Sequence, residues 1–225
     1  MEKCGRKQRV AIIEDCNVTA EGLRHLLMSA RDRHFTFHFF RTIAEFKLAA
    51  RQGQFDAVMY CLSGTRELRI ECLLAMGEIA NHQPEVMRGI LANDKEEAAL
   101  IRHLSPTYIH GVLSKSDTLS DLRHSVFALL NEAIEDREAM EGFAALRENR
   151  FLSPTENLIL RYMTYGYSLM DISQQLGRNI KTIRAHKFNA MTKLGVRSDI
   201  GLLNAADILL HLPMSGANNA VKQVA

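Results

Sequence analysis

Apolar and polar residues follow two different patterns along this chain of 225 residues. In the first 130 residues, short apolar runs alternate with longer segments of helical character, and the runs lie at 10–13, 37–40, 57–62, 89–92 and 111–113. Strands that alternate with helices are typical of a parallel sheet with helices on both faces. We therefore expect an α/β part, a doubly wound parallel (βα)5 domain.

After residue 150 the pattern changes to three short helices. Two capping boxes open the first two helices, and two glycines stand where left-handed C-terminal caps need a residue without Cβ. These residues are Ser153 with Glu156, Ser168 with Asp171, Gly166 and Gly177. Pro154 suits the first position of a helix, where its missing N–H would have no partner. Asn179 can cap a third helix, which we expect from about Ile180 to Leu194.

The third helix has an inward and an outward side. Ile183, Ala190 and Leu194 share one side of a helical wheel, which predicts that this side docks on the first two helices. On the outward side, cations can reach phosphates or guanine edges, and small or aromatic residues can touch thymine methyl groups. The residues predicted to bind DNA are Lys181, Thr182, Arg184, Ala185, Lys187 and Phe188. An isolated basic helix face is more often only solvated, but its place after two short helices favours a recognition helix.

Residues 152–206 resemble the helix-turn-helix of the LuxR/FixJ family. The residues that carry the resemblance are Leu152, Ser153, Glu156, Gly166, Ile172, Leu176, Lys181, Thr182, Ile183, His186 and the run 193–196. In that family a fourth helix pairs two domains, and the resemblance implies the same for the apolar stripe that follows. Its predicted pairing residues are Ile200, Leu203 and Leu210. We therefore expect the second part to be all-α, a four-helix LuxR-type helix-turn-helix domain.

Polar residues follow the first and last of the predicted strands. Glu14 and Asp15 come after the first strand, and Lys115 comes after the last. In doubly wound sheets the carboxyl ends of the strands face one crevice, so these side chains, Cys61 and Ala92 are expected to converge on one pocket. Their order and spacing resemble the receiver domain of two-component response regulators, in which an acidic pair, an aspartate, a hydroxyl residue and a lysine handle Mg²⁺ and a phosphoryl group.

Three positions depart from the receiver pattern. Cys61 stands where the phosphoacceptor aspartate would be, Ala92 replaces the hydroxyl residue, and Val112 stands where an aromatic residue is expected. A thiol is a soft ligand, which hard Mg²⁺ disfavours. We therefore expect a pseudo-receiver that phosphorylation does not control, with the acidic pair and the lysine left as a vestigial pocket. An alternative is that Cys61 is a redox sensor activated by Lys115, because a nearby cation lowers the pKa of a thiol.

Charge and composition limit the class of function. Residues 151–225 hold 8 Lys and Arg against 4 Asp and Glu, whereas residues 1–150 hold 20 against 22, so the basic excess accompanies the predicted DNA-binding part. The four cysteines form no CxxC pair, and the chain has no glycine-rich phosphate loop or nucleophile elbow. We expect no metal, no cofactor and no enzymatic activity. No apolar run is long enough for a signal peptide or a membrane span, so we expect a cytoplasmic protein that does not bind a membrane.

These observations predict four segments. They are a pseudo-receiver at 1–130, a helical and charged linker at 131–150, a LuxR-type DNA-binding domain at 151–212 and a flexible tail at 213–225. The whole chain resembles the enterobacterial auxiliary regulators that pair with the response regulator RcsB. The resemblance implies a transcription activator that binds specific double-stranded DNA as a heterodimer with an RcsB-like response regulator. Two alternatives stay open: a self-sufficient homodimeric regulator, and a protein that titrates a partner without binding DNA.

Overall fold

Strands and helices alternate through the first part of the chain and only helices follow. The computed structural model describes residues 7–28, 34–62, 64–104, 109–135 and 152–211. The first part contains β1 Gln8–Ile13, α1 Asn17–Met28, β2 Phe35–Phe40, α2 Ile43–Gln52, β3 Ala57–Cys61, α3 Arg66–His82, β4 Met87–Ala92, α4 Lys95–Leu104, β5 Gly111–Ser114 and α5 Leu119–Glu135. The second part contains α6 Pro154–Thr164, α7 Leu169–Gln175, α8 Ile180–Leu194 and α9 Asp199–His211.

The strands form one parallel sheet in the order β2-β1-β3-β4-β5. In this register Val10 of β1 lies opposite Phe37 of β2 and Ala57 of β3. Every residue of β3 and β4 is buried, because helices cover both faces of the central strands. The predicted doubly wound (βα)5 fold is confirmed, and so is the all-α part that follows it.

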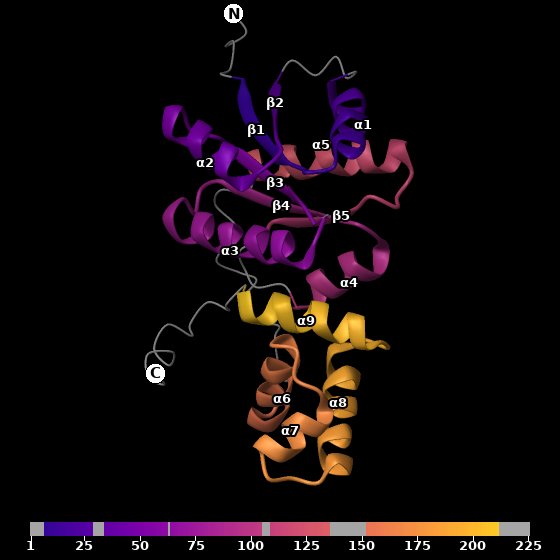
Figure 1. The fold of residues 1–225 in the computed structure, drawn as a ribbon. Helices are drawn as coiled ribbons and strands as arrows, with labels where there is room; N and C mark the ends of the chain where they lie inside the picture. Colours follow the sequence, from indigo (N-terminus) through magenta and orange to yellow (C-terminus); the bar gives the residue numbers. More distant parts are fainter. Residues whose placement is uncertain (1–6, 29–33, 63, 105–108, 136–151, 212–225) are drawn as a thin grey trace, which may run out of the picture.

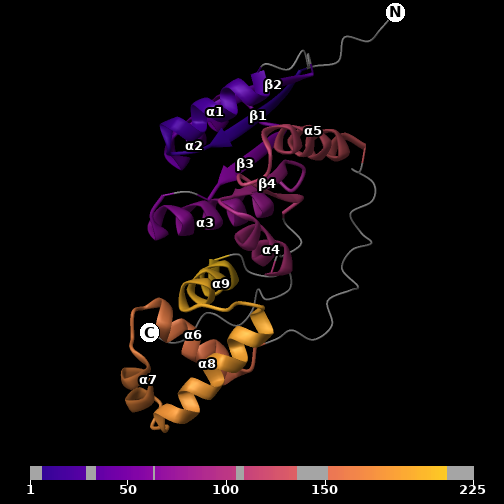
Figure 2. The ribbon, with the colours of Figure 1, turned by 90° about the vertical axis from the view of Figure 1, so that its right-hand side faces the viewer.

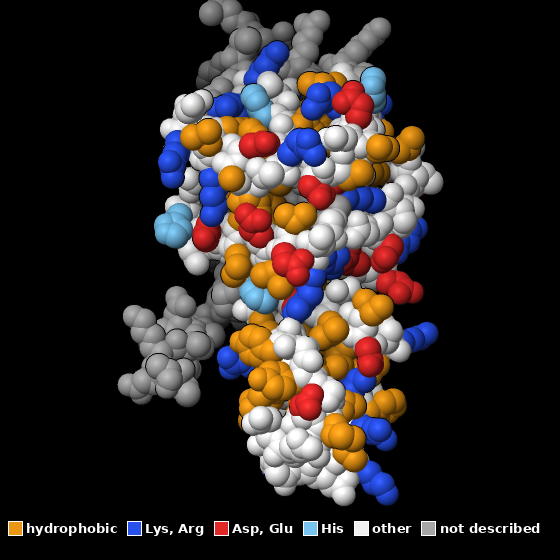
Figure 3. Space-filling model, in the orientation of Figure 1, with side chains coloured by type: hydrophobic (Ala, Val, Ile, Leu, Met, Phe, Trp, Pro, Cys, Tyr) orange, Lys and Arg blue, Asp and Glu red, His pale blue; other side chains and the backbone are white. Residues whose placement is uncertain are grey.

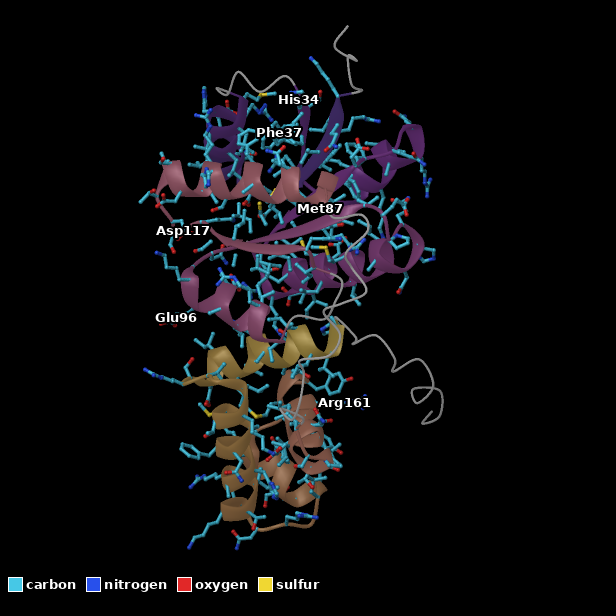
Figure 4. All side chains as sticks on the ribbon, turned by 180° about the vertical axis from the view of Figure 1, so that it is seen from behind. His34, Phe37, Met87, Glu96, Asp117 and Arg161 are labelled. Carbon is cyan, nitrogen blue, oxygen red and sulfur yellow. The ribbon has the colours of Figure 1, made fainter. Side chains whose placement is uncertain are left out.

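The helices lie in two layers on the sheet (Figures 1 and 2). On one face, Leu23 and Leu27 of α1 and Val126 of α5 belong to a single apolar cluster with β1 and β3. Phe37 of β2 packs on this layer, its ring centroid 6.0 Å from that of Phe127 in α5 (Figure 4). Helices α2, α3 and α4 cover the opposite face. The loops that follow the strands lie at the carboxyl edge of the sheet, where the pocket is predicted.

The helices α6, α7 and α8 close around a small core of their own. Ile159, Ile172 and Ile183 contribute one fully buried side chain from each helix. Both predicted capping boxes are present, since Ser153 accepts from the backbone N–H of Glu156 and the second pair does the same at the start of α7. These helices therefore begin where local hydrogen bonding predicts.

Helix α9 lies between the two parts of the molecule (Figure 2). It contacts α6 and α8 on one side and α3 and α4 on the other. Leu202, Ala205 and Ala206 of α9 belong to the same buried apolar cluster as Leu73 and Ile101 of the first part. One continuous core therefore joins the sheet to the C-terminal helices.

The predicted linker and tail fall largely outside the described residues. Helix α5 continues to Glu135, past the predicted limit of the first domain at residue 130. Residues 136–151 and the predicted tail at 213–225 lie outside the described residues. Among the helices that are described, none combines the length and the apolar character that crossing a bilayer requires.

Candidate nucleic-acid interface

Helix α8 has a defined start and end. The side chain of Asn179 accepts a hydrogen bond of 2.8 Å from the backbone N–H of Lys181. Gly195 ends the helix in the left-handed conformation, with φ of 68°, which a residue without Cβ adopts at little cost. The boundaries match the sequence prediction because both caps are made by neighbouring residues.

The inward side of α8 is apolar. Ile183, Ala190 and Leu194 are buried, and α8 contacts α6 and α7. These contacts fix the rotation of the helix about its own axis. The opposite side must therefore face solvent.

The outward side carries five of the six residues predicted to bind DNA. Phe188 leaves 68% of its surface exposed, which is unusual for a large aromatic residue. The other four exposed residues are Lys181, Thr182, Arg184 and Ala185. Figure 3 shows basic side chains along the edge of the C-terminal part where α8 runs in Figure 1. Their contacts with DNA stay a prediction.

Asn189 belongs to the same face and the sequence interpretation missed it. It is exposed and follows Ala185 by four residues, which puts both on one side of the helix. Its amide has no hydrogen-bond partner among the described residues, and asparagine can pair with both edge atoms of adenine in the major groove. The helical wheel contains the signal, because Asn189 lies about 120° around the helix from the buried Ile183.

Lys187 differs from the rest of the predicted set. Its ammonium lies 2.6 Å from a carboxylate oxygen of Asp199 at the start of α9, and only 15% of its side chain is exposed. The carboxylate is also favourable at a helix N-terminus. In this structure Lys187 therefore links α8 to the start of α9 by an ion pair and does not project from the outward face.

A second ion pair supports α8 from α6. Lys193 donates to the buried carboxylate of Glu156 at 2.8 Å, and Glu156 also accepts from the backbone N–H of Ser153 at 2.7 Å. Burial opposes ionisation of this carboxyl, but the hydrogen bonds from Lys193 and Ser153 hold its pKa below the ordinary value. Glu156 thus caps α6 and anchors the end of α8.

Helix α9 exposes part of its predicted pairing stripe. Ile200 is 74% exposed and Leu210 is 41% exposed, while Leu203 is half-buried. Leu202 and Ala206 of the same helix are buried in the joint core. The face left for a partner is therefore narrower than the full apolar stripe suggests.

The polar residues at the sheet edge meet as predicted. The ammonium of Lys115 lies 2.6 Å from the carboxylate of Glu14, whose side chain is fully buried. The backbone N–H of Lys115 donates to the carbonyl of Ala92 at 2.8 Å, and Asp15 is half-buried beside them. Ala92 has no hydroxyl to offer a phosphoryl group, and Lys115 is already engaged by Glu14.

The interpretation of Cys61 as a redox sensor activated by Lys115 is wrong, because its thiol is harder to ionise than an ordinary cysteine. Cys61 is buried at the end of β3, and burial, with the charge of Glu14 as a second cause, raises the pKa of its thiol well above the ordinary value. Lys115 lowers that pKa by less. The sequence gives no sign that the more acidic thiol is Cys16, which is exposed before α1. Hydrogen bonding by Thr19 lowers the pKa of Cys16.

Within the described residues, no three His, Cys, Asp or Glu side chains gather in a way that could hold a metal ion. The features that remain are an exposed face on α8 with basic and aromatic residues, a partly exposed α9 and a sheet-edge pocket closed by an internal ion pair. Binding through α8 is the chemistry that these features support.

Known proteins share both parts of this architecture. Residues 150–206 match the model of the family described as bacterial regulatory proteins, luxR family. The chain is 42% identical over 216 residues to the transcriptional activator protein BglJ of Escherichia coli strain K12, and the match covers 96% of each chain. This likeness extends through both the sheet and the C-terminal helices.

A second relative is the transcriptional regulatory protein RcsB of Escherichia coli strain K12. It is 32% identical over 131 residues, which are 56% of this chain and 60% of RcsB. A solved complex of the two-component response regulator RcsB with DNA superposes with a TM-score of 0.63 at 23% identity, covering 91% of this chain and 100% of the other. At that identity the superposition shows a shared fold.

Proposed function

Because this chain belongs to the LuxR-type, response-regulator-like transcription regulators, we propose that it activates transcription at specific promoters without being phosphorylated, paired with an RcsB-like response regulator. As a member of this class it is a DNA-binding transcription regulator. The observation that carries DNA recognition is the outward face of α8, which is exposed while the opposite side is anchored in the core.

DNA recognition is assigned to α8 in the major groove. Lys181 and Arg184 reach phosphates or guanine edges, and Ala185 and Phe188 touch thymine methyl groups. Thr182 lies at the edge of this face. The residues are exposed, and no rearrangement of α8 is needed before it meets a groove.

Independence from phosphorylation is supported by the sheet-edge pocket. Cys61 offers a buried thiol where a carboxylate would accept the phosphoryl group. Lys115 is held by Glu14, and Ala92 has no hydroxyl. With these side chains the pocket has no acceptor for an acyl phosphate, so abundance of the protein and of its partner sets activity.

Pairing with a second regulator is supported by likeness to BglJ and to RcsB. We assign the contact in the DNA-binding part to the accessible residues of α9, namely Ile200, Leu203 and Leu210. We also propose domain limits at 1–130 and 151–212, with residues 131–150 as the connection. A regulator of bacterial promoters acts where the chromosome lies, so we place it in the cytoplasm.

The test is selection of genomic DNA fragments by the purified chain, alone and mixed with an RcsB-like partner. Salt must be held fixed because phosphate contacts make affinity strongly salt-dependent. Fragments retained only by the mixture support the heterodimer. The same fragments retained by the chain alone would identify a homodimeric regulator, for which the exposed Ile200 and Leu210 are the favouring observation.

Variants of α8 distinguish a protein that binds DNA from one that only titrates a partner. Lys181→Ala and Arg184→Ala should each weaken selection by the mixture, whereas Lys47→Ala, which removes an exposed ion pair on α2, should not. If the recognition-helix variants activate a promoter in cells as well as the original chain does, the protein acts without touching DNA and the proposal is wrong.

A further inference from the structure

The C-terminal helices are attached to the first part of the chain by an apolar contact. Leu202, Ala205 and Ala206 of α9 are at most 1% exposed, and they share one buried cluster with Leu73 of α3 and Ile101 of α4. Domains in one chain usually move relative to each other unless the interface between them is large and apolar. The apolar character of this contact therefore favours a single arrangement of the two parts.

An ion pair beside this contact fixes how α9 lies on α3. Arg66, the first residue of α3, donates from Nε and Nη2 to the two carboxylate oxygens of Asp207 in α9 at 2.7 and 2.6 Å. Its Nη1 donates to the carbonyl of Thr164 at the end of α6 at 3.1 Å. One planar guanidinium thus binds two of the C-terminal helices and fixes direction as well as distance. The side chain of Asp207 is 7% exposed, so this buried charge has its partner in the other part of the chain.

Helices α3 and α4, on which α9 lies, are themselves tied together. Arg69 of α3 follows Arg66 by about one helical turn and forms an ion pair with the buried carboxylate of Glu97 in α4. Glu97 also accepts a hydrogen bond of 2.8 Å from the backbone N–H of Asn93, in the turn that follows β4. The surface that receives α9 is therefore held in place by contacts that reach back to the sheet.

In this arrangement the outward face of α8 is open. The first part contacts the C-terminal helices mainly through α9, whereas α7 and the start of α8 lie at the end of the molecule farthest from the sheet (Figures 1 and 2). Lys181 and Arg184 are exposed on that start of α8. A groove of DNA can therefore meet α8 without any separation of the two parts.

We propose that the Arg66–Asp207 ion pair and the apolar contact beside it hold the C-terminal helices permanently in this open arrangement, both in the free protein and on DNA. The chain then has no closed form that a signal must open. A ligand or modification moves a protein between two arrangements only by as much as it favours one over the other, so a single stable arrangement leaves nothing to switch. The inference deepens the proposed independence from phosphorylation, on which its regulatory meaning rests.

Hydrogen–deuterium exchange of the full chain, followed by mass spectrometry, measures this docking without DNA, so its failure is distinct from failure of DNA binding. Arg66→Ala should make the backbone amides of α9 exchange at least about tenfold faster, while those of β3 and β4 keep their protection. Lys47→Ala is the matched control, because its exposed ion pair with Glu78 joins α2 to α3, and it should leave α9 unchanged. If folded Arg66→Ala exchanges like the original chain, the ion pair does not hold α9 and the proposal is overturned.

A second pair of variants loosens the docking without removing a charge. A Cβ added at Gly77 of α3 would lie 4.0 Å from the carbonyl oxygen of His211, the last residue of α9, which is an ordinary van der Waals contact. Gly77→Ala should therefore keep the slow exchange of α9, whereas the longer side chain of Gly77→Phe meets the end of α9 and should speed its exchange. Both replacements favour a helix over glycine, so α3 should still form. If Arg66→Ala does not fold by circular dichroism, this pair decides the test, and equal protection of α9 in both variants overturns the proposal.

The same measurement with DNA tests whether the arrangement is permanent. A genomic fragment selected in the test of the proposed function should slow the exchange of α8, while α3 and α9 exchange no faster than in the free protein. Faster exchange of α9 on DNA would mean that the two parts separate, and it would overturn the proposal. If α8 gains no protection, the assignment of DNA recognition to α8 is wrong, whereas the docking is still decided by the variants measured without DNA.

Discussion

Replacement of Lys115 by Met should destabilise the protein without changing how it binds DNA. The substitution leaves the carboxylate of Glu14 fully buried without the ammonium that lies 2.6 Å from it. Breaking a buried pair by removing one partner costs about 3–5 kcal/mol. Glu14 keeps a hydrogen bond of 3.0 Å from the backbone N–H of Cys16. We therefore expect the lower end, about 3 kcal/mol of unfolding free energy.

For a chain of this size the expected loss corresponds to a melting temperature lower by about 6–12 °C. Denaturant unfolding followed by circular dichroism measures the free energy. Glu14→Gln combined with Lys115→Met should recover most of the loss, because neither charge then lies buried alone. Lys47→Met is the matched control: its partner Glu78 is 57% exposed and Lys47 is 52% exposed, so its effect should be about 0–1 kcal/mol.

DNA binding by the same variants separates a structural role from a signalling role. In a receiver controlled by phosphorylation, the lysine would touch the phosphoryl group, and its loss would change the response to a phosphate donor. Here, affinity measured below the unfolding transition should match the original chain. The reasoning is refuted if Lys115→Met costs no more than the control, or if folded Lys115→Met no longer binds DNA.

Four further predictions concern other parts of the molecule. Lys181→Ala and Arg184→Ala should each weaken specific binding to DNA. Each should also reduce the magnitude of the slope of log affinity against log salt by about 1 for each phosphate that is no longer neutralised. Fluorescence anisotropy at several salt concentrations measures this slope, and an unchanged slope would mean that the side chain contacts a base instead. Replacing the contacted thymine by uracil should weaken binding about fourfold, the effect of one buried methyl group, and Phe188→Ala should be insensitive to that replacement in the same assay. The pKa of Glu156 is lowered in the folded state, so its contribution to stability is present above the unfolded pKa and is lost as pH falls through the folded pKa. Glu156→Gln should therefore be less stable than the original chain at neutral pH and equally stable in acid. Urea unfolding of both proteins across this pH range shows whether their free energies of unfolding converge. Cys61→Ser should leave operator affinity unchanged under oxidising and reducing conditions, and a redox-dependent difference between the two proteins would restore the sensor hypothesis.

The boundaries of the C-terminal helices could be predicted from the sequence because neighbouring residues make them. Ser153 and Glu156 are three residues apart, and each satisfies a backbone N–H at the start of α6. Gly195 ends α8 through its own left-handed backbone. The alternation of strands and helices likewise predicted the sheet, since parallel strands covered on both faces need nearly continuous apolar runs.

The sequence predicts which residues meet at the sheet edge, but it does not predict how deeply they are buried or how easily they ionise. The doubly wound topology alone brings Glu14 and Lys115 together, although they are 101 residues apart. How deeply Cys61 is buried depends on how α1 and α5 pack over β3, which no local pattern records. Burial therefore reversed the expectation of a reactive thiol, because desolvation exceeds the effect of the nearby cation.

The sequence by itself determined the two-part architecture, the outward face of α8 and the cysteine at the end of β3, because these depend on residue type and on spacing within single elements. Only the tertiary structure decided that Lys187 pairs with Asp199 and that Arg66 reaches Asp207 across 141 positions of the chain. Such pairs form when packing of the core brings distant helices together. Their energies depend on burial, which a one-dimensional pattern does not contain.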